Sequence, residues 1–164
     1  MFKINQYIVY NSMGVYKIVD IRTEELITNE KIQYYVLEPA FKDNMTIKIP
    51  VGNDKVLMRG VISKEDAVSV IEAMPKTETV WISNNKARTD SFMKALRSNE
   101  CGQLVELIKL LHEEKVERTS LGKKLWKKDE DIMKVAERNL YEEFAIALKI
   151  SPAEVLPFIR EHVS

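Results

Sequence analysis

SKEDAVSVIEAM, residues 63–74, marks the point at which the chain changes from a strand pattern to a helix pattern. Ser63 is a favourable helix cap, and two acidic residues follow it in the first turn, where the helix dipole favours negative charge. Pro75 comes directly after the segment and helps to end the helix. The sequence therefore predicts two modules that meet near residues 58–64.

The chain before this change is rich in Val, Ile and Tyr, the residues that favour strands. Turn-forming residues separate the apolar runs, at Asn11-Ser12-Met13-Gly14, Thr28-Asn29-Glu30 and Lys42-Asp43-Asn44. Pro50 lies at the end of a run, which indicates a strand near a sheet edge. We therefore expect residues 1–60 to form a small antiparallel barrel or curled sheet. The expected strands lie in QYIVY (6–10), GVYKIVDI (14–21), KIQYYVLEPAF (31–41) and MTIKIPV (45–51).

The chain after the change follows a helical period, so residues 61–164 are predicted to be all-α and the fold class α+β. The last helix opens at the capping box SPAE (151–154), and we expect Pro157 to kink or truncate it. The other helices after the first are expected near residues 88–97, 103–117 and 129–148. The faces predicted to be buried carry Leu104, Leu107, Ile108 and Leu111, and Met133, Ala136, Leu140, Phe144 and Leu148.

The 164 residues carry 25 basic and 25 acidic side chains, so no net field draws the whole molecule to nucleic acid or a membrane. Basic side chains are instead concentrated in residues 76–97 and 115–128, which predicts a positive face on the helical module. A single cysteine, Cys101, suits a reducing compartment. No apolar run approaches the roughly 20 residues of a membrane span. We therefore expect a soluble, cytoplasmic protein.

Few residues suggest catalysis. His112 and His162 have no evident link to each other, and Cys101 has no partner base in view. The three acids of Asp129-Glu130-Asp131 splay about 100° apart on a helix, so they do not converge on a metal. The chain has no glycine-rich phosphate loop. We expect no catalytic residue, no metal, no cofactor and no small-molecule substrate.

Trp81 lies in TVWISNNKARTDSFMKAL (79–96), ahead of an Asn-Asn pair and a basic helix. In one interpretation its ring packs under the linker as a satellite core residue. In the other it is a wedge inserted at a base step in the minor groove, at a cost of a few kcal/mol of unstacking. A wedge needs phosphate contacts close by, and Lys86 and Arg88 are candidates near a helix N-terminus.

FKINQYIVYNSMGVYKIVDI (2–21) resembles the opening of the CarD/CdnL family of bacterial transcription regulators. The same module resembles the polymerase-docking domain of the bacterial transcription–repair coupling factor. Further similarities follow in the order of the CarD/CdnL family: YYVLEP (34–39), MTIKIPV (45–51), Trp81 with Lys86 five residues on, LVELIKLL (104–111) and LWKKDEDIMKVAERNLYEEFAIAL (125–148).

The resemblance implies a non-catalytic protein with a Tudor-like (SH3-like) β domain over residues 1–60 that binds the RNA polymerase β subunit. It implies that the helical domain, residues 61–164, binds promoter DNA at the upstream edge of the bubble, where a tryptophan enters the minor groove and favours the open complex. It associates such a protein with the nucleoid through polymerase. By position, Trp81 matches the wedge and Lys86 a basic residue that contacts DNA.

The resemblance also implies a set of polymerase contacts. Lys48, in TIKIP, matches a position that is usually arginine, and a lysine there keeps the charge but loses bidentate pairing. Arg22 is the basic residue near the second expected contact. The full set of expected polymerase contacts is Lys48, Ile47, Ile49, Pro50 and Arg22.

Three departures from the family pattern lie in the helical part: Asn84 and Asn85 stand where basic and aromatic residues are common, and Trp126 where a small polar helix cap is common. An alternative hypothesis is a protein-only adaptor, which docks on polymerase through a sheet edge and uses its helices to bind a second protein. A third is a hydrolase or transferase, for which the chain supplies no nucleophile–base pair.

Overall fold

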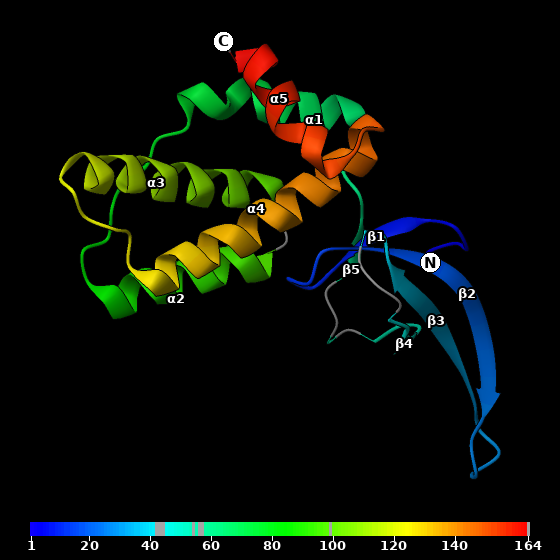
Figure 1. Cartoon of the computed structure of the whole chain (residues 1–164). Helices are drawn as coiled ribbons and strands as arrows, with labels where there is room; N and C mark the ends of the chain where they lie inside the picture. Colours follow the sequence, from blue (N-terminus) through cyan, green and yellow to red (C-terminus); the bar gives the residue numbers. More distant parts are fainter. Residues whose placement is uncertain (42–44, 54, 56–57, 99, 164) are drawn as a thin grey trace. The chain divides into compact units, whose positions relative to one another are not determined.

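The computed structural model describes residues 1–41, 45–53, 55, 58–98 and 100–163. The chain divides into two compact units, Met1–Val61 and Ile62–Ser164. The first holds a five-stranded antiparallel sheet and the second is helical, which confirms the predicted α+β class (Figure 1). The predicted turn at Lys42-Asp43-Asn44 lies outside the described residues.

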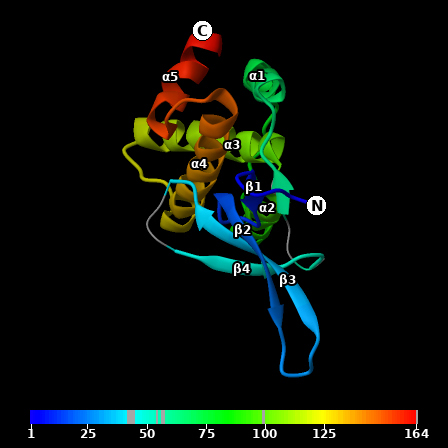
Figure 2. The same cartoon turned by 90° about the vertical axis from the view of Figure 1, so that its right-hand side faces the viewer.

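The sheet has the strand order β4-β3-β2-β1-β5. A long β2–β3 hairpin forms its centre, paired from Tyr16 opposite Pro39 to Glu25 opposite Lys31 (Figure 2). The short strands β4 and β5 form the two edges, so the edge position inferred from Pro50 agrees with the sheet order. The strands are β1 Tyr7–Tyr10, β2 Val15–Glu25, β3 Lys31–Pro39, β4 Ile47–Pro50 and β5 Met58–Gly60.

Two turns predicted from the sequence adopt the left-handed backbone that their residues favour. Asn11 has φ 46° and Gly14 has φ 111° between β1 and β2, and Asn29 has φ 63° between β2 and β3. Asparagine and glycine tolerate this region better than other residues. The strands between these turns alternate, and one face of the sheet buries a cluster of Ile8, Tyr16, Ile18, Tyr35, Leu37 and Ile49.

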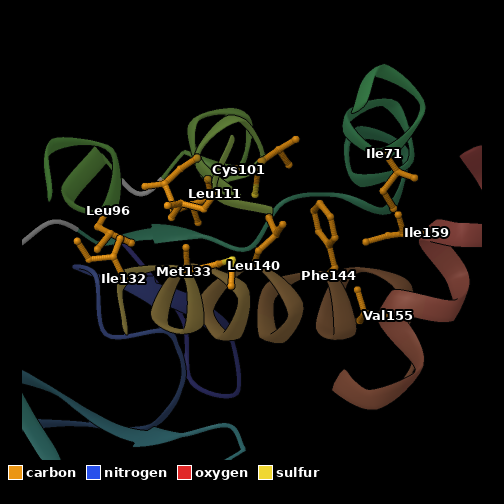
Figure 3. Close-up of a cluster of buried hydrophobic side chains, with 14 of the residues drawn as sticks. Ile71, Leu96, Cys101, Leu111, Ile132, Met133, Leu140, Phe144, Val155 and Ile159 are labelled. Carbon is orange, nitrogen blue, oxygen red and sulfur yellow. The ribbon is translucent and has the colours of Figure 1, made fainter. Parts of the chain in front are cut away.

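Helix α4 is central to the core of the helical unit. Figure 3 shows that its side chains point toward the other helices, and the buried cluster includes residues from all five α-helices. Helix α1 begins as predicted, because the Ser63 hydroxyl accepts a hydrogen bond from the Asp66 N–H at 3.1 Å. The helices are α1 Lys64–Ala73, the 3₁₀ turn η1 Met74–Lys76, α2 Asn85–Ser98, α3 Cys101–Ser120, α4 Lys127–Leu148 and α5 Pro152–Val163.

Two helix predictions are corrected by the structure. Helix α2 begins at Asn85, three residues earlier than its apolar pattern indicates, because polar residues form its first turn. Helix α5 continues through Pro157 to Val163, so the predicted truncation is wrong. Val155 and Ile159 lie on either side of this proline and are both buried, and their packing offsets the backbone hydrogen bond that proline cannot donate.

In the part of the chain that the structure describes, no helix combines the length and the apolar character that crossing a bilayer requires.

Candidate nucleic-acid and polymerase interfaces

Trp81 lies in the linker between η1 and α2 and is half-buried. Its ring packs against the buried ring of Phe92, with centroids 6.4 Å apart and planes inclined at 59°. Part of the indole therefore contacts the core of the helical unit, and part stays accessible to solvent. The ring is not sealed in the interior, so this position is compatible with contact to a partner.

Arg88 is buried, with 2% of its surface exposed, although its place near a helix N-terminus predicts a phosphate contact. Its guanidinium carbon lies 4.6 Å from the centroid of the Trp81 ring. A side chain covered to this extent does not reach a DNA phosphate. We therefore revise the role of Arg88 from a DNA contact to the support of Trp81.

All five N–H donors of Arg88 have acceptors. The Asp129 carboxylate accepts from Nε at 3.2 Å and from Nη2 at 2.9 Å. The carbonyls of Ile82 and Ser83 accept from Nη1 at 3.0 and 3.3 Å. The Asn85 side chain accepts from Nη2 at 2.8 Å. Arg88 thus fixes the backbone that follows Trp81 and joins the N-terminal ends of α2 and α4, which lie side by side in Figure 1.

Asp129 is fully buried in the first turn of α4, where the sequence predicts acidic enrichment alone. The ion pair with Arg88 spans 41 positions of the chain, so no local pattern reveals it. Trp126 is the N-cap residue of α4, and its ring centroid lies 5.5 Å from the Arg88 guanidinium carbon. We call Trp81, Asn85, Arg88, Trp126 and Asp129 the Arg88 cluster.

Asn84 caps helix α2. Its side-chain oxygen accepts a hydrogen bond from the Ala87 N–H at 2.9 Å, and its carbonyl accepts from the Arg88 N–H at 2.9 Å. Together with the bond that Arg88 donates to the Asn85 side-chain oxygen, this gives both asparagines a structural role. Their presence in place of basic residues therefore has a local physical reason.

We expect Asn84→Ala to lower the free energy of unfolding of the helical unit by about 1 kcal/mol, because the cap bond to Ala87 is lost. Urea denaturation followed by tryptophan fluorescence measures this change, since both tryptophans lie after residue 62. Asn84→Asp is the matched control, because aspartate caps about as well as asparagine. Equal stability of the alanine and aspartate variants would contradict the capping role.

The basic residues of 115–128 divide into two groups. Lys115 contacts Glu130 at 3.3 Å, which lowers the pKa of that carboxyl, and Arg118 contacts Glu114 at 2.9 Å. The second group precedes or begins α4 and is exposed: Lys123, Lys124, Lys127 and Lys128. Lys86 is exposed in the first turn of α2. The exposed lysines of the helical unit thus include a group at the N-terminal ends of α2 and α4.

The predicted polymerase contacts divide between the two faces of the sheet. Ile47 and Ile49 lie on the side of the buried cluster, and Ile49 belongs to it. Lys48 and Pro50 alternate with them and are exposed. Arg22 pairs with Tyr34, which pairs with Pro50, so Arg22 lies on the exposed face with Lys48 and Pro50. Only these three side chains of the predicted set are exposed.

Both cations of this face have acidic neighbours. Lys48 Nζ lies 2.7 Å from a Glu24 carboxylate oxygen, and Arg22 Nε lies 2.8 Å from one of Asp20. The hydrogen bond from Arg22 lowers the pKa of the Asp20 carboxyl, and a bond from the Ile21 N–H adds to the effect. Such exposed pairs contribute little to stability, so a partner's carboxylates can replace them at small cost.

The residues considered for catalysis lie apart. Cys101 is buried and its sulfur lies 3.2 Å from a Glu143 carboxylate oxygen, whereas His112 and His162 are exposed on α3 and α5. Among the residues that the structure describes, no group of three or more His, Cys, Asp or Glu side chains is placed to hold a metal ion.

Comparison with protein families gives a match for the N-terminal unit. Residues 2–62 match the model of the CarD-like/TRCF RID domain, a non-catalytic domain that interacts with RNA polymerase. Comparison with curated proteins finds no match. The matched residues include all five strands and the exposed face with Lys48 and Arg22. Residues 2–62 are therefore a CarD-like/TRCF RID domain, and the chain is an RNA polymerase-interacting, transcription-related protein.

Proposed function

We propose that this protein stabilises the open promoter complex by binding two macromolecules at once. The RID domain binds the RNA polymerase β subunit, and the helical unit binds promoter DNA at the upstream edge of the bubble. Trp81 enters the minor groove there as an apolar wedge. The observation that carries this proposal is the partly buried Trp81 ring, which keeps some surface accessible and is backed by a buried, fully hydrogen-bonded Arg88.

The support of the ring matters because insertion between bases costs unstacking energy. A freely rotating side chain would also lose its own conformational entropy on insertion. Trp81 is already held by Phe92 at one side and by the Arg88 guanidinium at its face. The Trp81 side chain is therefore already ordered before it binds. Binding then costs little conformational entropy, which favours affinity.

Lys86 supplies the electrostatic part of the DNA contact. It is exposed five residues after Trp81, whereas Arg88 is buried. With equal numbers of acidic and basic side chains, the protein is expected to bind free DNA weakly and with strong salt dependence. Binding to polymerase raises its local concentration at the promoter, so a modest DNA affinity is sufficient.

Strand β4 supports the polymerase contact. It pairs with β3 on one side and forms a sheet edge on the other, the geometry that lets a partner add a strand through main-chain hydrogen bonds. The buried Ile49 holds this strand on the core, and Lys48 and Pro50 lie on the outer face. We assign Lys48, Pro50 and Arg22 to direct contact and Ile47 and Ile49 to positioning of the strand.

We expect Lys48→Glu to weaken polymerase binding at least tenfold, because it places a like charge beside Glu24 and reverses the charge that this position presents to the partner. A pull-down with purified polymerase measures this loss. Lys31→Glu is the matched control, since Lys31 is exposed on β3 and lies on the other face of the sheet. Equal binding by the two variants would remove Lys48 from the interface.

A photoreactive amino acid at position 81, incorporated into an otherwise native chain, tests the DNA contact. In a polymerase–promoter complex we expect the label on DNA near the upstream edge of the bubble. Label on protein alone would support an adaptor that binds polymerase and a second protein without touching DNA.

A further inference from the structure

We propose that Trp126 is a second base-stacking platform, and that the pocket beside it receives a nucleotide of the unpaired DNA strand. This inference rests on the proposed function, because it assigns a further contact to the same DNA partner. The Trp126 pocket has a volume of about 340 Å³ and is lined by Asn85, Lys86, Thr89, Asp90, Trp126 and Lys128. Ligand pockets span about 300–1,000 Å³, so one nucleotide is a suitable occupant.

Packing on the hydrophobic core does not explain the position of Trp126. Its neighbour Leu125 is part of the hydrophobic core, whereas Trp126 is 40% exposed and lies outside the buried clusters. It occupies the N-cap of α4 and makes no side-chain capping bond. A helix start favours a small polar residue, so the indole is unfavourable there unless it has another use.

The rings of Trp126 and Trp81 both lie close to the guanidinium of Arg88. The Arg88 guanidinium carbon lies 4.6 Å from the centroid of the Trp81 ring and 5.5 Å from that of the Trp126 ring, so the two rings lie within about 10 Å of each other. Successive bases of a strand are about 3.4 Å apart along the helix axis. The two rings are therefore close enough to contact one strand within about three nucleotides.

The walls of the Trp126 pocket favour an anion with a flat apolar part. Lys86 and Lys128 bring positive charge from α2 and α4, and Asp90 opposes them. The Thr89 hydroxyl oxygen is buried, and within the described residues it has no hydrogen-bond partner. Exposed aromatic rings beside basic side chains are the usual means of binding unpaired nucleotides, because every base has a π-face. Bases inside a duplex do not present this face.

Intrinsic fluorescence separates the two rings, because the chain has two tryptophans. Trp81→Phe leaves Trp126 as the reporter, and Trp126→Phe leaves Trp81. Each variant is titrated at low ionic strength with a fork DNA, a duplex that ends in unpaired thymines, and with the fully paired duplex. We expect the fork to quench Trp126 and the paired duplex to leave it unchanged, while the fork also quenches Trp81.

The outcomes distinguish this inference from the proposed function. Quenching of Trp81 by the fork without quenching of Trp126 overturns the second platform and leaves the wedge intact. Quenching of Trp126 without Trp81 overturns the wedge and keeps the pocket. Equal quenching of Trp126 by fork and paired duplex would also overturn stacking, since a general contact with the DNA backbone would then account for it.

Binding of labelled fork DNA, measured by anisotropy, gives the size of the effect. We expect Trp126→Ala to lower the affinity for the fork about tenfold, the size typical of one base–aromatic stack, and to change the affinity for the paired duplex less than about twofold. Trp126→Phe should restore most of the loss. Leu121→Ala is the control, because Leu121 is 66% exposed at the C-cap of α3 and does not line the Trp126 pocket.

Two charge changes in the Trp126 pocket should act in opposite directions. Asp90→Asn removes the opposing carboxylate and should strengthen fork binding about two- to threefold, and Lys128→Gln should weaken it by a similar factor. If both substitutions strengthened fork binding, or both weakened it, this result would argue against an anion in the pocket. Thermal unfolding of each variant checks that the helical unit stays folded.

Discussion

Replacing Trp81 with alanine should shorten the lifetime of the open promoter complex about tenfold and leave polymerase binding unchanged. The accessible part of the ring offers the apolar surface that replaces base stacking at the edge of the bubble, and a contact of this kind is worth about 1–3 kcal/mol per base. Alanine removes the surface, so the bubble closes faster. Decay of preformed complexes after addition of a competitor measures the lifetime.

The RID domain lies outside this change, so a pull-down with polymerase should give the same binding for the alanine variant and the unaltered protein. Val80→Ala is the matched control, because Val80 is the adjacent residue and is 81% exposed. Trp81→Phe should retain part of the lifetime, since phenylalanine keeps a π-face. An unchanged lifetime in the alanine variant would remove the wedge from the mechanism.

Replacing Arg88 with alanine should strongly lower the free energy of unfolding of the helical unit. The change leaves the Asp129 carboxylate buried without its cation, and removing one partner of a buried ion pair costs about 3–5 kcal/mol. It also releases the carbonyls of Ile82 and Ser83, so the linker that carries Trp81 loses its fixed conformation. Urea denaturation followed by tryptophan fluorescence reports on the helical unit, which holds both tryptophans.

The double variant Arg88→Leu with Asp129→Leu should regain much of the lost stability, because it buries no unpaired charge. Arg97→Ala is the control, since Arg97 is exposed on the same helix. Arg88→Lys should keep the charge but leave several of the acceptors unsatisfied, because lysine lacks the planar arrangement of five donors. In conditions where this variant is folded, it should shorten the open-complex lifetime as Trp81→Ala does.

Stability of the alanine variant within about 1 kcal/mol of the unaltered protein would show that the buried pair does not organise the helical unit. A lysine variant with a full open-complex lifetime would separate Arg88 from the support of Trp81. The two measurements therefore test the structural and the functional roles of Arg88 independently.

The sequence predicts the α+β class, the principal strands and the longer helices because these depend on local patterns. The change of hydrophobic period at residues 63–74 is visible within about three turns of helix, and the cap at Ser63 within the first turn. The three-residue strand β5 is too short to show an alternation, and the continuation of α5 past Pro157 depends on buried neighbours. Elements of this kind are decided by pairing and packing.

The sequence by itself also determined that a tryptophan lies close to the N-terminus of a helix with basic residues. It likewise determined that apolar and polar side chains alternate in the strand that contains Lys48. Only the tertiary structure decided what each cation does. Arg88 faces a carboxylate 41 positions away and lies against two indole rings, whereas Lys86, two residues earlier, is exposed. The physical reason is that hydrophobic periodicity acts over a few residues, but the burial and pairing of a charge depend on which distant segment folds against it.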